Sequence, residues 1–143
     1  MPTPVVSAAT TTWNGQLLTG RGSVSLDSSR AVTLNMSWKA RAEGGAETTT
    51  PEELLAAAHS GCFSMAFANI LAQAEFTPDH IVTTSEVTFR ASVGVVSSHL
   101  TVRARVPGIS RSEFEALATQ AKETCPVSQA LAGIDISLEA VLE

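Results

Sequence analysis

The longest apolar stretch of the chain covers residues 50–74, TPEELLAAAHSGCFSMAFANILAQA, and carries very few charges. Apolar or small residues surround its whole circumference when it is drawn as a helix, and such a helix is expected to be buried on all sides. Thr50 as N-cap, Pro51 at the first helical position and Glu53 three residues after the cap predict where the helix begins. Because its start is capped, the pattern favours a core helix over a membrane span.

The residues before this helix have strand patterns. Segments 4–13 and 16–26 are rich in valine, threonine and serine, and Asn14-Gly15 between them is a strong signal for a β-hairpin. Residues 30–38 alternate between apolar and polar positions, which predicts a half-buried strand. The next segment, KARAEGGAETTT, is polar and contains glycine, so we expect it to be a loop that leads into the helix.

The second half of the chain begins and ends with alternating segments. Residues 81–93 and 96–106 predict a hairpin around Gly94, and 134–142 predicts a final strand. The expected order is three strands, a helix, two strands, a helix and a strand, which suggests an α+β domain with helices on an antiparallel sheet. With 143 residues and no visible repeat or linker, we expect one domain, residues 1–143.

Between these segments the chain predicts a second helix. Ser110 followed by Glu113 forms the pattern of a capping box, and apolar residues at helical spacing predict an amphipathic helix to about Thr124. Cys125-Pro126 should interrupt it, because the residue before a proline is pushed away from helical angles. A short helical turn is expected to follow.

Charge and the N-terminus narrow the possible partners. The formal net charge is −5 and no basic cluster is present, which argues against a nucleic-acid partner. The start of the chain, MPTPVVSAATTTW, lacks the basic start and apolar core of a signal peptide, so we expect a cytosolic protein. In that reducing compartment two cysteines are more often catalytic, redox-active or buried than joined in a structural disulfide.

The two cysteines are the candidate chemistry of the chain. Cys62 lies in the middle of the apolar helix and Cys125 at the end of the later one, a spacing that matches neither a CxxC pair nor a zinc knuckle. His59 precedes Cys62 by three residues, but two ligands do not make a zinc site, so we expect no metal. We interpret His59 as a core histidine with one satisfied nitrogen. Cys62 is then either a small buried hydrophobe or a reactive thiol.

A reactive Cys62 needs a lowered pKa, because the thiolate is the reacting form and apolar surroundings raise the pKa of a thiol. A cation must therefore lie close to it. The candidates are Arg41 in the segment before the helix, Arg21 in the first hairpin, and His59.

A carboxylate at the helix start is the candidate that holds an arginine. Glu53 is occupied if the capping box forms, which leaves Glu52 for this role. The alternative is that Arg41 and Glu52 are ordinary loop and helix-start charges, since acidic residues stabilise a first helical turn in any case.

The segments TTPEELLAAAHSGCFSMA and CPVSQAL resemble the osmotically inducible protein C family (OsmC), which is related to the organic hydroperoxide resistance proteins (Ohr). The resemblance covers nearly the whole chain, because TWNG, GRGSVS, RAEG, FTPDHI and VPGI follow in order. It implies an antiparallel sheet wrapped around central helices in an intertwined homodimer. It also implies a thiol-dependent peroxidase, without haem or another cofactor, that reduces organic hydroperoxides and, less well, hydrogen peroxide.

The resemblance assigns roles by position. Cys62 matches the peroxidatic cysteine, Cys125 the resolving cysteine, Glu52 the family's glutamate and Arg41 its arginine. In the Ohr branch the arginine lies in the first hairpin, where this chain has Arg21. The implied mechanism passes through a sulfenic acid on Cys62 and a Cys62–Cys125 disulfide, which an external dithiol, such as the lipoyl protein known for Ohr relatives, reduces.

The positions of Glu52 and Cys62 raise a geometric problem. They are ten positions apart, about 15 Å of rise in a continuous helix, so they cannot serve one site within one chain. We therefore expect Arg41 and Glu52 of one chain to meet Cys62 of a second, across an antiparallel pair of central helices in a two-fold dimer. The alternatives are a cysteine-based redox sensor and a non-catalytic binder of apolar ligands. We expect no membrane partner.

Overall fold

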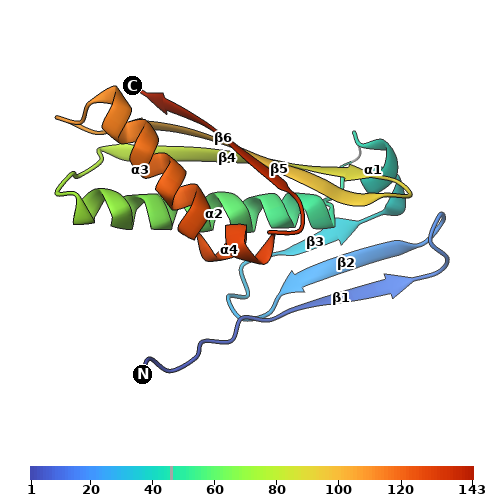
Figure 1. The fold of residues 1–143 in the computed structure, drawn as a ribbon. Coiled ribbons are helices and arrows are strands. Elements are labelled where there is room, and N and C mark those ends of the chain that lie inside the picture. Colours follow the sequence, from blue (N-terminus) through green and yellow to red (C-terminus); the bar gives the residue numbers. More distant parts are fainter. Residues whose placement is uncertain (46) are drawn as a thin grey trace. The chain divides into compact units, whose positions relative to one another are not determined.

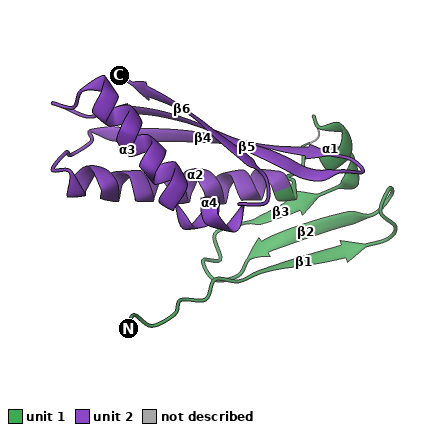
Figure 2. Cartoon of the chain, in the orientation of Figure 1, with its two compact units in different colours: residues 1–51 green, residues 52–143 purple. Residues whose placement is uncertain are grey.

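The computed structural model describes residues 1–45 and 47–143, and the chain divides into two compact units, residues 1–51 and 52–143 (Figure 2). Each unit contains its own three-stranded sheet (Figure 1). The helices and strands together confirm the predicted α+β class. The expectation of a single domain over 1–143 stays a prediction.

Unit 1 begins with an antiparallel sheet in the order β1-β2-β3. Its strands are β1 (Ala9–Asn14), β2 (Arg21–Leu26) and β3 (Thr33–Met36). The predicted hairpin is confirmed, but Asn14 pairs with Arg21, so the connection covers residues 15–20 and is longer than a two-residue turn. Gly15 opens this connection at φ 91°, a left-handed angle that favours glycine.

The expected loop after the third strand is wrong in its first half, because α1 (Trp38–Glu43) occupies it. The alternation of apolar residues extends to Trp38, but the strand ends at Met36. Ser37 then caps the helix by accepting the Ala40 N–H at 3.2 Å, and Gly44 at φ 73° ends it. The signal was present in the sequence: a serine before KARAE, which are mostly good helix formers, and a glycine after them.

Unit 2 has a mixed sheet in the order β4-β5-β6. β4 (His80–Arg90) and β5 (Gly94–Arg105) form the predicted antiparallel hairpin, whereas β6 (Asp135–Leu142) pairs parallel to β5. The expectation of a wholly antiparallel sheet is therefore wrong. The reason is the crossover: two helices separate β5 from β6, and a chain that crosses a sheet in this way returns in the same direction.

The two crossover helices are α3 (Arg111–Thr124) and α4 (Pro126–Ala130). Both bonds of the predicted capping box between Ser110 and Glu113 are present, which confirms the start of α3. Cys125 separates the two helices at φ −57° and ψ 123°, an extended conformation, as Pro126 requires of the residue before it.

The long helix α2 (Pro51–Gln73) begins at Pro51, as predicted. It forms the core of unit 2 with α3 and β5, because Phe63, Phe67 and Leu71 are fully buried in one cluster with residues of those elements. Figure 1 shows α2 lying along the β4–β6 sheet. By length and composition α2 could also cross a membrane, a test that core helices of soluble proteins often pass.

The expectation that α2 is buried on all sides is wrong for the single chain. One stripe of the helix is exposed, and Ala57, Gly61, Met65 and Asn69 lie along it at spacings of four residues. Because three of these four residues are alanine, glycine and methionine, the sequence shows no polar face, so hydrophobicity alone could not reveal the stripe. The stripe is a mostly apolar, exposed surface in the single chain.

Candidate active site

The structure brings Cys62 and Cys125 together within unit 2. Cys62 points from the middle of α2 and Cys125 from the junction between α3 and α4, and their sulfur atoms are 3.0 Å apart. A disulfide bond is about 2.05 Å long, so this contact joins two reduced thiols. Cys125 is fully buried, whereas Cys62 is partly exposed. Two residues far apart in the sequence are thus placed where little movement would join them.

The surroundings of the pair act differently on the two thiols. Burial raises the pKa of Cys62, and its hydrogen bond with Cys125 raises it further. Burial acts to raise the pKa of Cys125 too, but hydrogen bonds from Cys62 and from Ser128 outweigh it and lower the pKa. When both thiols are protonated, Cys125 donates to Cys62, and the bond reverses when Cys125 loses its proton. Within unit 2, therefore, the surroundings favour a thiolate on Cys125 over one on Cys62, and a thiolate on Cys62 calls for a nearby cation.

Cys62 opens onto a cavity of about 510 Å³. Apolar side chains from α2, together with Pro126 beyond α3, form most of its wall, and the lining residues are Cys62, Met65, Ala66, Asn69, Ile70, Thr124 and Pro126. A small organic molecule can therefore approach the Cys62 sulfur along an apolar surface.

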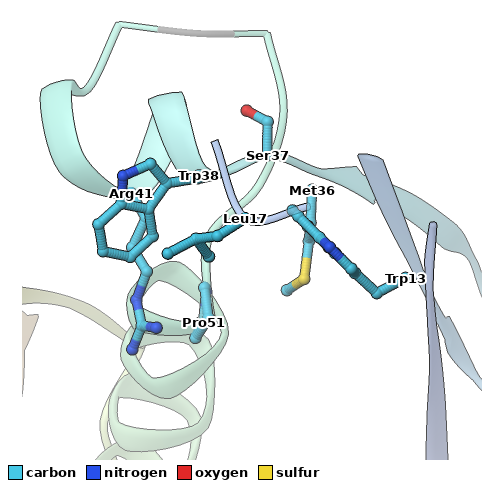
Figure 3. Close-up of a pocket in the computed structure, with 7 residues that line it drawn as sticks. All are labelled: Trp13, Leu17, Met36, Ser37, Trp38, Arg41 and Pro51. Atoms are coloured by element: carbon cyan, nitrogen blue, oxygen red, sulfur yellow. The ribbon is translucent and has the colours of Figure 1, made fainter. Parts of the chain in front are cut away.

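Arg41 lies in unit 1, on α1, beside a cavity of about 290 Å³. The residues that line this cavity are Trp13, Leu17, Met36, Ser37, Trp38, Arg41 and Pro51. In Figure 3 the Arg41 side chain extends past Trp38 toward Pro51. Arg21, the alternative arginine, is exposed at the start of β2, where its guanidinium donates to the Gly20 carbonyl at 2.9 Å. Unit 1 thus combines the Arg41 cation with apolar walls.

Glu52 is buried in the first turn of α2. The helix runs without interruption from Pro51 to Gln73, so Glu52 and Cys62 stand ten positions apart on one straight element. The corresponding rise of about 15 Å means that the carboxylate and the thiol of one chain are not brought together.

His59 is fully buried and uses both ring nitrogens. Nδ1 lies 2.6 Å from Ser98 Oγ on β5, and Nε2 lies 2.8 Å from Ser128 Oγ on α4. Burial lowers the pKa of His59, which keeps the ring neutral. The interpretation as a satisfied core histidine is confirmed, although two nitrogens are satisfied rather than one. In the part of the chain that the structure describes, no group of three or more histidine, cysteine or acidic residues could hold a metal ion.

Sequence reasoning missed the residue that links this histidine to the thiol pair. Hydrogen bonding from the Ser128 side chain and backbone lowers the pKa of the Cys125 thiol. The available signal was the position of Ser128, in the first turn of a helix that begins directly after Cys125. Ser98 gave no such signal, because it is the one polar residue among the fully buried residues of β5.

Known proteins resemble this chain over most of its length. It is 38% identical over 122 residues to "Peroxiredoxin OsmC" of Escherichia coli, covering 83% of this chain and 85% of that protein. It is 31% identical over 127 residues to "Organic hydroperoxide resistance protein" of Xanthomonas axonopodis pv. citri, covering 83% and 86%. The crystal structure of an organic hydroperoxide resistance protein from Elizabethkingia anophelis superposes with a TM-score of 0.73 at 26% identity, covering 100% of both chains.

The family model described as OsmC-like protein matches residues 44–139. This range includes Glu52, both cysteines and the two crossover helices. The expected resemblance is therefore confirmed, and the chain belongs to the OsmC-like protein family.

Proposed function

We propose that this protein is a thiol peroxidase that reduces organic hydroperoxides, with Cys62 as the attacking thiol and Cys125 as the resolving thiol. The observation that carries the proposal is the 3.0 Å contact between the two sulfur atoms beside an apolar cavity. The names of the relatives in Escherichia coli and Xanthomonas, a peroxiredoxin and a hydroperoxide resistance protein, support the same reaction.

The first step is the attack of the Cys62 thiolate on one oxygen of the hydroperoxide. The O–O bond breaks, the other oxygen leaves with its organic group and takes up a proton as an alcohol, and Cys62 becomes a sulfenic acid. The peroxide is reduced by two electrons, and the sulfur is oxidised by two. The partly exposed position of Cys62 at the cavity gives the peroxide access to this sulfur.

The second step closes the disulfide. The Cys125 thiolate attacks the Cys62 sulfur, and the hydroxide that leaves takes up a proton to become water. Because the sulfur atoms already lie 3.0 Å apart, closure needs only a small movement at the joint between α3 and α4. An external dithiol then reduces the disulfide and is itself oxidised. We propose a lipoyl-type dithiol in the cytosol for this role, since no group of the described residues supplies the two electrons.

The cation for Cys62 comes, in this proposal, from a second copy of the chain. Within unit 2, burial and Cys125 raise the pKa of Cys62, so a thiolate on Cys62 needs a cation nearby. Arg41 offers a guanidinium next to Trp38, Leu17 and other apolar side chains, the combination suited to a hydroperoxide with an apolar group. Glu52 would orient the guanidinium by a two-point contact.

The exposed stripe on α2 supports a homodimer. Ala57 and Gly61 are small enough for a second helix to approach closely, and Met65 is 72% exposed. Strand β1 is also exposed at all six residues. Exposed apolar surface such as that of Ala57 and Met65 marks an interaction site, and an antiparallel pair of α2 helices would bring Cys62 of one chain to the Glu52 end of the other.

The decisive experiment is turnover with cumene hydroperoxide and a dithiol, for the wild type, Cys62→Ser and Cys125→Ser. We expect Cys62→Ser to abolish peroxide consumption, and Cys125→Ser to allow one turnover followed by overoxidation of Cys62. Mass spectrometry after one equivalent of peroxide should find the Cys62–Cys125 disulfide in the wild type. Full activity of Cys62→Ser would contradict the proposal, and stoichiometric oxidation without turnover would indicate a redox sensor instead.

A further inference from the structure

A chain of hydrogen bonds crosses the core of unit 2 and ends at Cys125. Ser85 Oγ lies 3.0 Å from Ser98 Oγ, which lies 2.6 Å from His59 Nδ1. On the other side of the ring, His59 Nε2 lies 2.8 Å from Ser128 Oγ, and hydrogen bonding from the Ser128 side chain lowers the pKa of the adjacent Cys125 thiol. Ser98 and His59 are fully buried and Ser128 is 5% exposed, so water does not compete with these bonds.

The number of hydrogens in this chain fixes its direction. Ser128 has one hydroxyl hydrogen, and its stabilising effect on the Cys125 thiolate requires that this hydrogen faces the sulfur, so its oxygen accepts from the His59 Nε2–H. A neutral ring that carries its hydrogen on Nε2 must accept at Nδ1, so Ser98 donates there. The Ser98 oxygen is then left to accept from Ser85. Every donor therefore points toward the Cys125 sulfur, an arrangement in which the bonds strengthen one another.

We propose that His59 and Ser128 are positioning residues for the resolving step, and that together they hold a thiolate on Cys125 ready to attack the sulfenic acid on Cys62. This inference rests on the proposed function for the role of Cys125. His59 acts through Ser128, because it orients the hydroxyl so that the hydroxyl hydrogen faces sulfur and not the ring.

The chemistry of closure explains why such a device is useful. Cys125 must react as a thiolate, yet it is fully buried, and burial alone raises the pKa of a thiol. Neutral donors stabilise the negative charge without placing a second charge in the core, where an unpaired ion is costly. When the Cys125 thiolate attacks, the S–S bond forms, the S–O bond of Cys62 breaks, and the hydroxide takes a proton from solvent. The Cys125 sulfur then carries no negative charge, so it no longer needs the hydrogen-bond donors.

The groups that face Cys125 come from two helices. Cys62 on α2 is the titratable group in contact with its sulfur, and Val127 and Ser128 on α4 are the other residues that lower its pKa. Lys122 and Glu123 of α3 line, with Ser128, a surface cavity of about 300 Å³. The inward residues of β5 near this core are apolar apart from Ser98.

The first test measures the thiolate directly. In a Cys62→Ser background, Cys125 is the remaining one of the two cysteines, and its ultraviolet thiolate absorbance is followed against pH. We expect Ser128→Ala and His59→Leu to raise the midpoint by about one pH unit each, because a hydrogen bond to a charged group is lost. Ser128→Thr and His59→Gln keep a hydrogen-bond donor, so the titration midpoint of Cys125 in these variants should stay close to the wild-type value. If His59→Leu does not fold, Ser128→Ala and Ser128→Thr carry the test.

The matched control is Ser64→Ala. Ser64 lies on the same helix as His59, is partly buried, and donates to Thr83 Oγ1 at 2.8 Å, outside the chain that ends at Cys125. Its loss removes a comparable hydroxyl from unit 2 and should leave the midpoint of Cys125 unchanged.

The second test uses the intact cysteine pair and one equivalent of cumene hydroperoxide, with dimedone to trap the sulfenic acid. We expect the ratio of the closure rate to the oxidation rate to fall about tenfold at neutral pH in Ser128→Ala, with more dimedone adduct on Cys62. Wild-type midpoints and ratios in both Ser128→Ala and His59→Leu would overturn the inference. The inference would also be overturned if the ratio of closure rate to oxidation rate fell equally at every pH and stayed low in Ser128→Thr and His59→Gln. Such a fall would reflect altered packing alone.

The two proposals fail in different ways. If the wild type shows no oxidation of Cys62 by hydroperoxide, the proposed function is wrong, and the absorbance titration still decides whether His59 and Ser128 stabilise the Cys125 thiolate. If the wild type oxidises and closes normally while the variants match it, only the role of His59 and Ser128 is wrong.

Discussion

The two compact units differ in how completely each encloses its apolar residues. In unit 2, Phe63, Phe67, Leu71 and Phe114 are fully buried in one cluster. Among the described residues of unit 1, Val24 and Ala40 are the buried apolar ones, and β1 is exposed along its whole length. The thiol pair therefore lies in the self-contained unit, and the arginine in the unit with much apolar surface left open. This contrast suggests that unit 1 depends on further contacts, which the proposed second copy would supply.

Because unit 2 buries more of its apolar residues than unit 1, a substitution in the core of unit 2 should have the largest effect on stability. Phe67→Ala should lower the free energy of unfolding by about 3–5 kcal/mol, because Phe67 is fully buried and its ring lies 5.7 Å from Phe63 and 5.3 Å from Phe114. Val24→Ala in unit 1 should cost about 1–2 kcal/mol, since it removes roughly two CH₂ equivalents. Urea denaturation measures both values. Equal costs at the two positions would contradict the comparison.

The next effect concerns the cation of unit 1. Arg41→Met keeps the length of the side chain and its fit to the apolar cavity but removes the charge. We expect kcat/KM for cumene hydroperoxide to fall about 100-fold, which corresponds to about 2.7 kcal/mol of transition-state stabilisation. Arg21→Met is the matched control and should change the rate less than about threefold. The reverse result would assign the cation to the first hairpin.

A smaller effect is expected on the exposed stripe of α2. A Cβ atom at Gly61 would meet no heavy atom within 4 Å outside its own turn of helix, and Gly61 is exposed, so Gly61→Leu should leave the folded monomer intact. In the proposed dimer the added side chain would separate the helices, and we expect the dimer dissociation constant to rise at least about tenfold, or about 1.4 kcal/mol. Sedimentation measures it, with Thr119→Leu on the exposed face of α3 as control. A Gly61→Leu variant that stays dimeric and fully active would argue against this interface.

The smallest effect is the pH dependence that His59 contributes. Burial lowers its pKa from 6.5, so between 6.5 and the lowered value the unfolded chain binds the proton that the folded chain does not. Stability from this group is complete above pH 6.5 and is lost as the pH falls, with a slope of up to about 1.4 kcal/mol per pH unit.

Urea denaturation at pH 7 and pH 5 tests this sign. His59→Gln should flatten the curve in that window, whereas His80→Gln, at an exposed histidine that contacts Glu143, is the control. A wild-type protein that becomes more stable toward pH 5 would contradict the buried, neutral state of His59.

Local patterns in the sequence predicted much of the secondary structure. The hairpin of β4 and β5, the capping box at Ser110 and the break at Cys125-Pro126 depend on short-range rules, and all three are present. α1 was missed because the alternation of apolar and polar residues continues to Trp38 and predicts a strand there. In the structure Ser37 caps the helix instead, so the helix begins at Trp38. The parallel pairing of β6 was missed because the alternation of a strand carries no information about the direction of its neighbour.

The sequence by itself determined the candidate residues of the proposed chemistry, two cysteines, an arginine and a glutamate in the order of the family. It also predicted a continuous helix that separates Glu52 from Cys62. Tertiary structure alone decided that Cys62 and Cys125 touch and that a buried serine and histidine lead to Cys125. It also decided that one stripe of α2 remains open. The physical reason is that caps and periodicity act within a few residues, whereas a thiol contact or an exposed stripe depends on which elements the packed core brings together.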